Sequence, residues 1–312
     1  LLSGGLGLRI PLGGRRPVGT GVSFGLDLIY SSSVWDFAPA GPDTRANPDP
    51  LSNAGLGWRL SLGALLEPGD PTRTDKDPFN PGQPHPSWAF LEPDGSDHVL
   101  TPRLGTVVTG SDCTSGSACY SNDGTYLRMT QEGFEQVVVD GETMPLPRRV
   151  VSYPTGLRYV FLGFPGDGTD VDWRLRAIAG PFATILDADV TVEYSCQGKQ
   201  TSCEQSRAKW VITGRFNRAW TVLFKQDPAQ AGEENAVVGE VQVQEFGGGV
   251  ASYYLDYPGD PALPGDPTPP GDPLIVARPC GHTDPSTPAT LQVATLSRIR
   301  QPDGSFYAAV YD

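Results

Sequence analysis

Alternation of apolar and polar residues is the dominant pattern along this chain. Apolar side chains occupy every second position between residues 6 and 12, and the same period returns between residues 22 and 30. A period of two is typical of a β-strand with one buried face. The apolar positions of these two predicted strands are Leu6, Leu8, Ile10, Leu12, Val22, Phe24, Leu26, Leu28 and Tyr30. The glycine-rich segment between them, 13–19, predicts a turn.

The same alternation continues after a polar segment, Ser31–Asn53, that we expect to be a loop. Trp58, Leu60 and Leu62 then share one face of a third predicted strand. Shorter alternating segments follow at Trp88–Leu91, Tyr126–Met129, Gln136–Val139, Arg148–Tyr153 and Leu157–Leu162. No window of a dozen residues has the 3.6-residue period of a helix. The pattern therefore predicts an all-β protein built from antiparallel hairpins.

Composition supports this fold class. The 312 residues include 38 glycines and 31 prolines. Inside a helix, proline costs about 3 kcal/mol and glycine about 1 kcal/mol relative to alanine. An all-α protein is excluded on this ground, and a doubly wound α/β fold is not expected.

A repeated hairpin is predicted in the second half of the chain. An apolar residue followed by an alternating strand with an aromatic residue recurs at intervals of about 30 residues, with a double-length final interval. The apolar positions are Ile178, Ile212, Val241 and Ile299. The final interval holds a Pro/Gly/Asp-rich insert at 258–273, which we expect to be an exposed loop. A solenoid or continuously wound sheet produces such repeats, although any series of hairpins gives loose copies like these. We divide the chain into regions 1–172 and 173–312.

The five cysteines predict two local disulfides. Cys113 with Cys119, and Cys196 with Cys203, each bracket a short polar loop. Free thiols and a metal site remain alternatives, although zinc knuckles use closer spacing. Cys280, beside Gly281 and His282, is left as a lone thiol. Disulfides imply an oxidising compartment, so we expect a secreted or cell-surface protein.

Charge limits the expected partners. The formal net charge is −13, which repels nucleic-acid phosphates and disfavours anionic membrane surfaces. No apolar run approaches the roughly 18 residues of a spanning helix, so membrane insertion is not expected. The first residue is Leu1 rather than Met, so we expect a mature product or an excised fragment.

Two segments carry a resemblance to a known family. Leu26, Leu28 and Tyr30, followed by Gly55, Gly57, Trp58 and Leu60, resemble the opening region of RHS/YD-repeat proteins. The chain's end is similar to one YD unit, with Leu296, Ile299, Tyr307, Tyr311 and Asp312 at the matching positions. The resemblance implies a sheet wound into a hollow shell around a carboxyl-terminal toxin domain. Tyr30 is followed by Ser31 rather than the family's Asn, and the internal copies lack the usual Gly-Arg-Leu.

The resemblance assigns structural roles and no chemistry. It implies motif positions at Tyr30, Gly55, Gly57, Trp58, Tyr307, Tyr311 and Asp312. The implied partners are downstream parts of the same polypeptide, or a cell-surface partner. This chain contains neither the family's self-cleaving core nor a toxin domain, so it matches the beginning of a shell in a bacterial toxin or surface protein.

Catalytic residues, cofactors and metal ligands are not predicted. His85, His98 and His282 lack a Gly-x-Ser-x-Gly nucleophile motif, and the acidic segment Asp70–Asp77 lacks EF-hand spacing. Two further functions stay open as alternatives. If tryptophans on the predicted strands are exposed, the chain is a glycan- or protein-binding adhesin-like module. Carboxylate pairs, such as Asp187 with Asp189 and Asp170 with Asp172, leave room for a glycoside hydrolase.

Overall fold

The regular structure of this protein is entirely β. The computed structural model describes residues 6–40, 42–70, 85–102, 113, 117–139, 142–165, 171–197, 208–229, 236–261 and 273–310. Within these ranges every regular element is a strand, and all paired strands run antiparallel. The predicted all-β fold class is confirmed. The described part of the chain holds no helix of the length and apolarity needed to cross a membrane.

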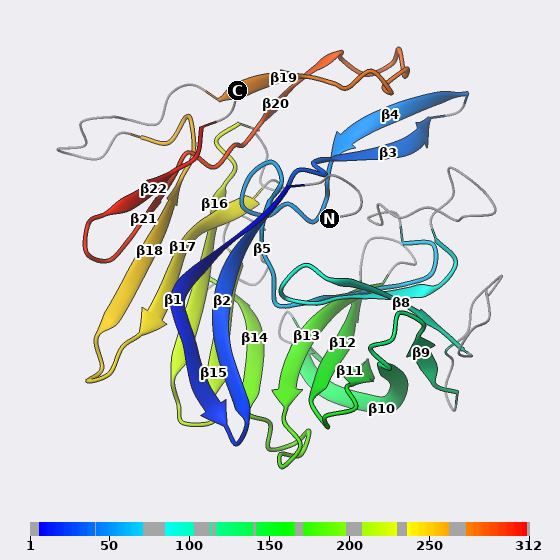
Figure 1. Ribbon diagram of the computed structural model, residues 1–312, viewed down its shortest axis with the longest axis vertical. Coiled ribbons are helices and arrows are strands. Elements are labelled where there is room, and N and C mark those ends of the chain that lie inside the picture. Colours follow the sequence, from blue (N-terminus) through cyan, green and yellow to red (C-terminus); the bar gives the residue numbers. More distant parts are fainter. Residues whose placement is uncertain are drawn as a thin grey trace.

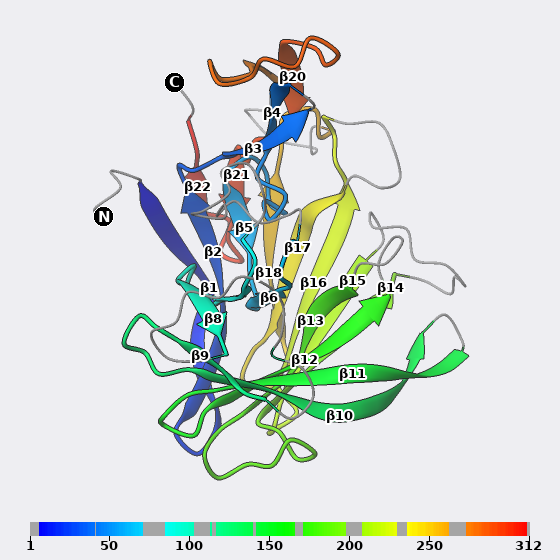
Figure 2. The ribbon, with the colours of Figure 1, turned by 90° about the vertical axis from the view of Figure 1, so that its right-hand side faces the viewer.

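Eight strands of the main sheet close into a ring. They are β6 (Ala64–Leu66), β7 (Trp88–Leu91), β8 (Asp97–Thr101), β9 (Cys119–Ser121), β10 (Arg128–Val139), β11 (Glu142–Ser152), β12 (Arg158–Pro165) and β13 (Val171–Ala179). Each strand pairs with the next along the chain, and the ring closes where Trp173 of β13 lies opposite Leu65 of β6. Figure 2 shows β10 and β11 sweeping across the base of the molecule, crosswise to the strands that follow.

Seven more strands extend the sheet outward from β13. They are β14 (Val190–Cys196), β15 (Ala208–Gly214), β16 (Ala219–Gln226), β17 (Ala236–Gln244), β18 (Val250–Asp256), β21 (Arg298–Arg300) and β22 (Phe306–Ala308). One edge of β13 is shared, because β6 occupies it at Trp173 and β14 occupies it at Ile178. The Tyr194 side chain lies at this fork and donates a 2.9 Å hydrogen bond to the carbonyl of Leu175.

Each of the four repeat copies forms one hairpin, and equivalent residues pair in all four hairpins. In each, the apolar residue identified in the sequence lies directly opposite the start of its partner segment. The pairs are Ile178–Val190, Ile212–Trp220, Val241–Tyr253 and Ile299–Tyr307. β18 pairs directly with β21, so the long final interval adds no strand to the sheet. The division between residues 172 and 173 falls inside β13, which belongs to both ring and extension.

A three-stranded sheet lies across one face of the extension (Figure 1). It consists of β1 (Gly7–Gly19), β2 (Val22–Ser31) and β5 (Trp58–Leu60). Phe24 of β2 packs edge-on against Trp220 of β16, with ring centroids 5.1 Å apart. One buried apolar cluster runs through this sheet, the extension and the ring. Trp58, Leu60 and Leu62 belong to it, as their shared strand face predicts.

Three sequence predictions in the first half of the chain are wrong in detail. Segment 13–19 is not the turn, because β1 continues to Gly19. Gly13 and Gly14 instead adopt positive φ at an irregularity in β1. Leu6 and Leu8 are exposed rather than buried, because Leu6 precedes β1 and the first buried residue of β1 is Leu12. The strands predicted at 126–129 and 136–139 belong to one strand, β10, with an irregularity between Gln131 and Phe134.

The predicted loop 31–53 contains a hairpin, which is a further correction. Its strands, β3 (Trp35–Ala40) and β4 (Asp43–Pro48), form a two-stranded ribbon outside the main sheet. A second ribbon, β19 (Leu274–Ala277) with β20 (Thr290–Val293), leaves the extension between β18 and β21. Of the insert 258–273, residues 262–272 lie outside the described residues, so its expected exposure stays a prediction.

The two ribbons meet in a contact that we call the clasp, between β4 and residues 278–284. Thr44 and Thr283 exchange two hydrogen bonds of 2.8 Å through their backbone and hydroxyl groups. The Ala46 amide donates to His282 Nδ1 at 3.1 Å, and Arg45 pairs with Asp284 at 2.9 Å. The clasp therefore supplies hydrogen-bond partners for the edge of β4 that faces away from β3. The alternation of apolar and polar residues did not predict a strand at these positions.

Candidate functional site

The motif positions at the start of the chain form one compact structure, the opening junction (residues 53–60 with Tyr30). Gly57 has a φ of 76°. A Cβ there would lie 2.7 Å from the Ser31 carbonyl oxygen. The Ser31 amide donates a 2.9 Å hydrogen bond to the Gly57 carbonyl. Glycine is therefore required at this position both for its backbone angle and for the close approach of β2.

The opening junction also binds the far end of the chain. A Cβ on Gly55 would lie 2.8 Å from the Leu296 amide nitrogen. The Leu56 amide donates to the Ala294 carbonyl, and the Val238 amide donates to the Asn53 carbonyl, each at 2.8 Å. The junction thus joins β2 to β17 and to the segment that leads into β21.

Aromatic motif residues lie at two separate places. Tyr30 and Trp58 are directly opposite each other on β2 and β5, with ring centroids 5.1 Å apart. Trp58 is 4% exposed, which places it in the core. Tyr307 lies on β22 at the outer edge of the extension. Tyr311 and Asp312 lie outside the described residues. The structure therefore brings the first four motif residues together and leaves Tyr307 apart from them.

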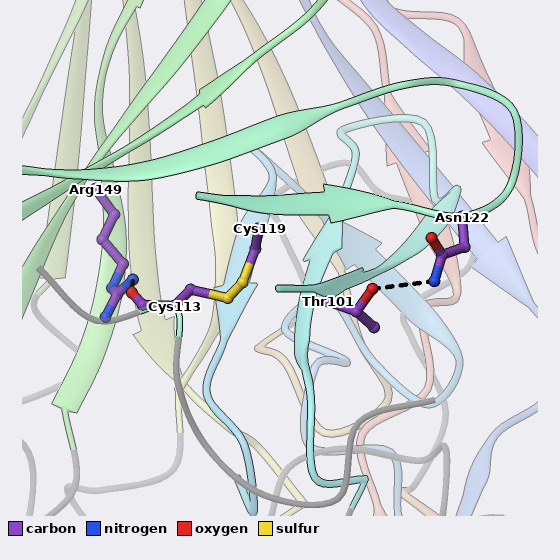
Figure 3. Close-up of a disulfide and its surroundings, with 5 residues drawn as sticks. All are labelled: Thr101, Cys113, Cys119, Asn122 and Arg149. Atoms are coloured by element: carbon purple, nitrogen blue, oxygen red, sulfur yellow. Dashed lines mark hydrogen bonds between the residues drawn. A yellow bond between two sulfur atoms is a disulfide. The ribbon is translucent and has the colours of Figure 1, made fainter. Parts of the chain in front are cut away.

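Cys113 and Cys119 form the first predicted disulfide, which Figure 3 shows beside β9. Their Cα atoms are 5.5 Å apart, within the range that a disulfide spans. Both residues are buried. Cys196 ends β14, but Cys203 lies outside the described residues, so the second pairing stays a prediction. Cys280 is an exposed free thiol.

Arg149 occupies the interior of the ring beside this disulfide. It reaches from β11 and donates a 2.8 Å hydrogen bond to the Cys113 carbonyl. Its guanidinium lies 3.9 Å from the ring centroid of Trp88, and Trp173 donates to Glu67 nearby at 2.6 Å. Burial lowers the pKa of Arg149 to about 10, although the charge of Glu67 opposes the shift. These contacts from opposite ring strands make the interior a packed cation–aromatic core.

A group of ionisable side chains surrounds His98 of β8, and we call it the His98 cluster. His98 Nδ1 is hydrogen-bonded to Asp123, and its Nε2 lies 3.0 Å from Glu92. Tyr153 is hydrogen-bonded to Glu92, and its pKa is raised, chiefly by burial. Burial likewise raises the pKa of Tyr159 to about 12. The cluster is therefore a connected set of hydrogen bonds that joins β8 to the turn after β7, the turn between β9 and β10, and the turn after β11, with the Tyr159 ring of β12 packed against Tyr153.

The geometry of the His98 cluster suits a hydrogen-bonded structural core. A histidine that activates a hydroxyl nucleophile needs one ring nitrogen facing that hydroxyl. Both nitrogens of His98 face carboxylates instead. Burial raises the pKa of Asp123, but hydrogen bonds from Thr125 and His98 outweigh it and lower the pKa to about 2. The cluster thus favours the ionised form of the Asp123 carboxyl group.

Other chemistry-bearing residues also have structural partners. Asp187 and Asp189 both pair with Arg215, and Asp189 accepts a further hydrogen bond from the Gly180 amide. His282 is engaged in the clasp through Ala46. Among the described residues, no group of three or more His, Cys, Asp or Glu side chains is placed to hold a metal ion. Asp75, Asp77 and Asp170 lie outside the described ranges.

Sequence reasoning missed the partners of His98 and the role of Arg149. Glu92 and Asp123 follow different strands, and nothing local joins them to His98. The available signal for Arg149 was its position two residues before Val151, which places both side chains on one face of the strand. Comparison with known protein families and with curated proteins gives no match to this chain.

Proposed function

We propose that this chain is a non-catalytic structural segment of a secreted RHS/YD-repeat protein. It forms part of a β shell that encloses or presents a carboxyl-terminal toxin or effector domain. The observation that carries the proposal is the shared register of four hairpins in one sheet. Adding equivalent hairpins side by side is how a repeat sheet grows, since each unit contacts chiefly its neighbours.

The outer edge of the extension supports the same proposal. β22 pairs with β21, and within the described residues no strand pairs with its other edge. Phe306, Tyr307 and Val310 are 56%, 50% and 86% exposed there. An apolar edge strand is a template for a further strand. In the proposed shell, the next hairpin of the same polypeptide pairs with β22.

The disulfide in the ring supports an extracytoplasmic location, because disulfides persist in oxidising compartments. The fork at β13 supports a role as the first part of the shell. The ring closes one end of the sheet, whereas the extension grows in one direction from it.

The gene around this segment provides the test. We expect the codons that follow Asp312 to encode further YD units and then a carboxyl-terminal domain. Electron microscopy of the full-length product should show a hollow shell. A stop codon directly after Asp312 would contradict the proposal, and so would a full-length product without an enclosed volume.

A shallow groove favours a second candidate, a glycan-binding module. It lies on one face of β16, β17, β18 and β21, where Glu240, Tyr254 and Arg300 form a cross-strand row. Tyr254 is 38% exposed, and the Arg300 guanidinium lies 4.8 Å from its ring centroid. Aromatic rings beside paired charges suit sugar recognition. Glycan-array binding that Tyr254→Ala abolishes would support this candidate, and an array without signal would remove it.

A further inference from the structure

Three successive hairpin turns of the extension each expose a phenylalanine. Phe182 lies between β13 and β14, Phe216 between β15 and β16, and Phe246 between β17 and β18. They are 79%, 73% and 75% exposed, and Leu186 in the first turn is 94% exposed. We call these four residues the turn rim. Large apolar side chains that gather at one place on a surface mark an interaction site.

The sheet topology places the turn rim on one edge. Because the hairpins pair side by side and antiparallel, their turns all fall at the same end of the strands. Figure 1 shows these turns along the lower and left side of the molecule. Consecutive turns also contact each other. Arg215 of the second turn pairs with Asp187 of the first, and Arg218 stacks 4.2 Å from the ring centroid of Phe246 in the third.

The local charge at the turn rim differs from that of the chain. Arg16 of β1 and Arg218 both lie over the Phe246 ring, at 5.3 Å and 4.2 Å. Within the described ranges, no ion pair joins either arginine to a carboxylate, whereas Arg215 pairs with both Asp187 and Asp189 and offsets one of their two charges. Glu245, next to Phe246 in the sequence, adds a third carboxylate, which the three arginines Arg16, Arg215 and Arg218 match in number. The turn rim therefore lacks the acidic excess of a chain whose net charge is −13.

We propose that the turn rim docks on a zwitterionic phospholipid surface. Phenylalanines at the tips of convex turns fit a soft headgroup layer, where their rings enter the boundary with the acyl chains. Arg16 and Arg218 then donate hydrogen bonds to lipid phosphate oxygens. Lipids with net negative charge are disfavoured because the remainder of the chain is acidic. This docking is peripheral, and it is independent of the proposed shell.

Sedimentation with phosphatidylcholine vesicles tests this proposal. We expect the 312-residue chain to bind such vesicles, and to bind more weakly when phosphatidylserine is added. The double variant Phe216→Ser/Phe246→Ser should bind at least about tenfold more weakly, because it loses two apolar side chains that enter the interface. Ile275→Ser is the matched control, since Ile275 is 67% exposed on β19, away from the turn rim. It should bind within about twofold of the original chain.

Thermal unfolding should be the same for both variants, because all three side chains are exposed. The proposal is overturned if the original chain does not sediment with phosphatidylcholine, or if the double variant binds equally well. It is also overturned if the original chain does not bind vesicles but self-associates in analytical ultracentrifugation, and the double variant does not self-associate. That result would make the turn rim a contact between two copies of the chain.

Discussion

At the scale of single residues, the opening junction depends on glycines that fit where no side chain can. Gly57 combines a left-handed backbone with the contact to Ser31, whereas Gly304 has a φ of 86° and no atom within 4 Å of its would-be Cβ. Gly304→Ala should therefore cost about 1 kcal/mol for the backbone alone. Gly57→Ala should cost about 1–3 kcal/mol more, since neighbouring backbone must move. Urea unfolding of both variants measures the difference, and equal losses would mean that the close approach carries no cost.

The pKa of Asp123 makes a prediction about acid stability. Its folded value, about 2, lies below the roughly 3.9 expected for an unfolded chain. A lowered carboxyl pKa stabilises the fold above about pH 4, and that contribution disappears as pH falls toward about 2. Asp123→Asn should therefore be less stable than the original near neutral pH and converge with it between about pH 4 and pH 2.

Unfolding midpoints across this pH range provide the measurement for Asp123. Glu142→Gln, on an exposed position of β11, serves as the control and should change little at any pH. A stability difference that stays constant from neutral to acidic pH would show that the carboxylate of Asp123 is not selectively stabilised in the folded chain.

At the scale of elements, the clasp joins two ribbons that leave the main sheet. Among the described side chains of β3, β4, β19 and β20, none belongs to the main core cluster; Ala46 and Val293 are buried, but outside that cluster. His282→Ala removes the acceptor of the Ala46 amide. We expect hydrogen exchange at Ala46 to become much faster, while the global free energy of unfolding changes by about 0.5 kcal/mol or less. A large global loss would show that the ribbons unfold together with the sheet.

The hairpins were predictable from sequence, whereas the contacts that join distant elements were not. Ile212 and Trp220 lie close in the chain, so alternation and a turn were enough to pair them. Ring closure depends on Leu65 meeting Trp173, a contact between two short stretches without a distinctive local pattern. The hairpin of β3 and β4 was missed for a similar reason, since residues 278–284 complete its edge. The resemblance marked both Gly55 and Leu296, but not the contact between their backbones.

At the scale of the whole molecule, the Cys113–Cys119 disulfide constrains the ring interior. Cys113→Ala/Cys119→Ala should lower the free energy of unfolding by about 2 kcal/mol by the chain-entropy estimate for so short a loop. Cys280→Ala should leave stability nearly unchanged, because that thiol is exposed. Denaturant unfolding compares the three proteins, and non-reducing peptide mapping checks the bond. Free thiols at both positions in protein purified without reductant would contradict the disulfide and the oxidising location together.

The opening junction also determines how late in synthesis its contacts can form. Its glycines and Asn53 meet Val238, Ala294 and Leu296, so a nascent chain holds one half of the contact long before the other half exists. At ribosomal speeds of about 5–20 residues per second, that interval lasts roughly 12–50 seconds. During it, the amino-terminal hairpin has no finished sheet to cover. The core of this chain can therefore be completed only after residues 238–296 have been made.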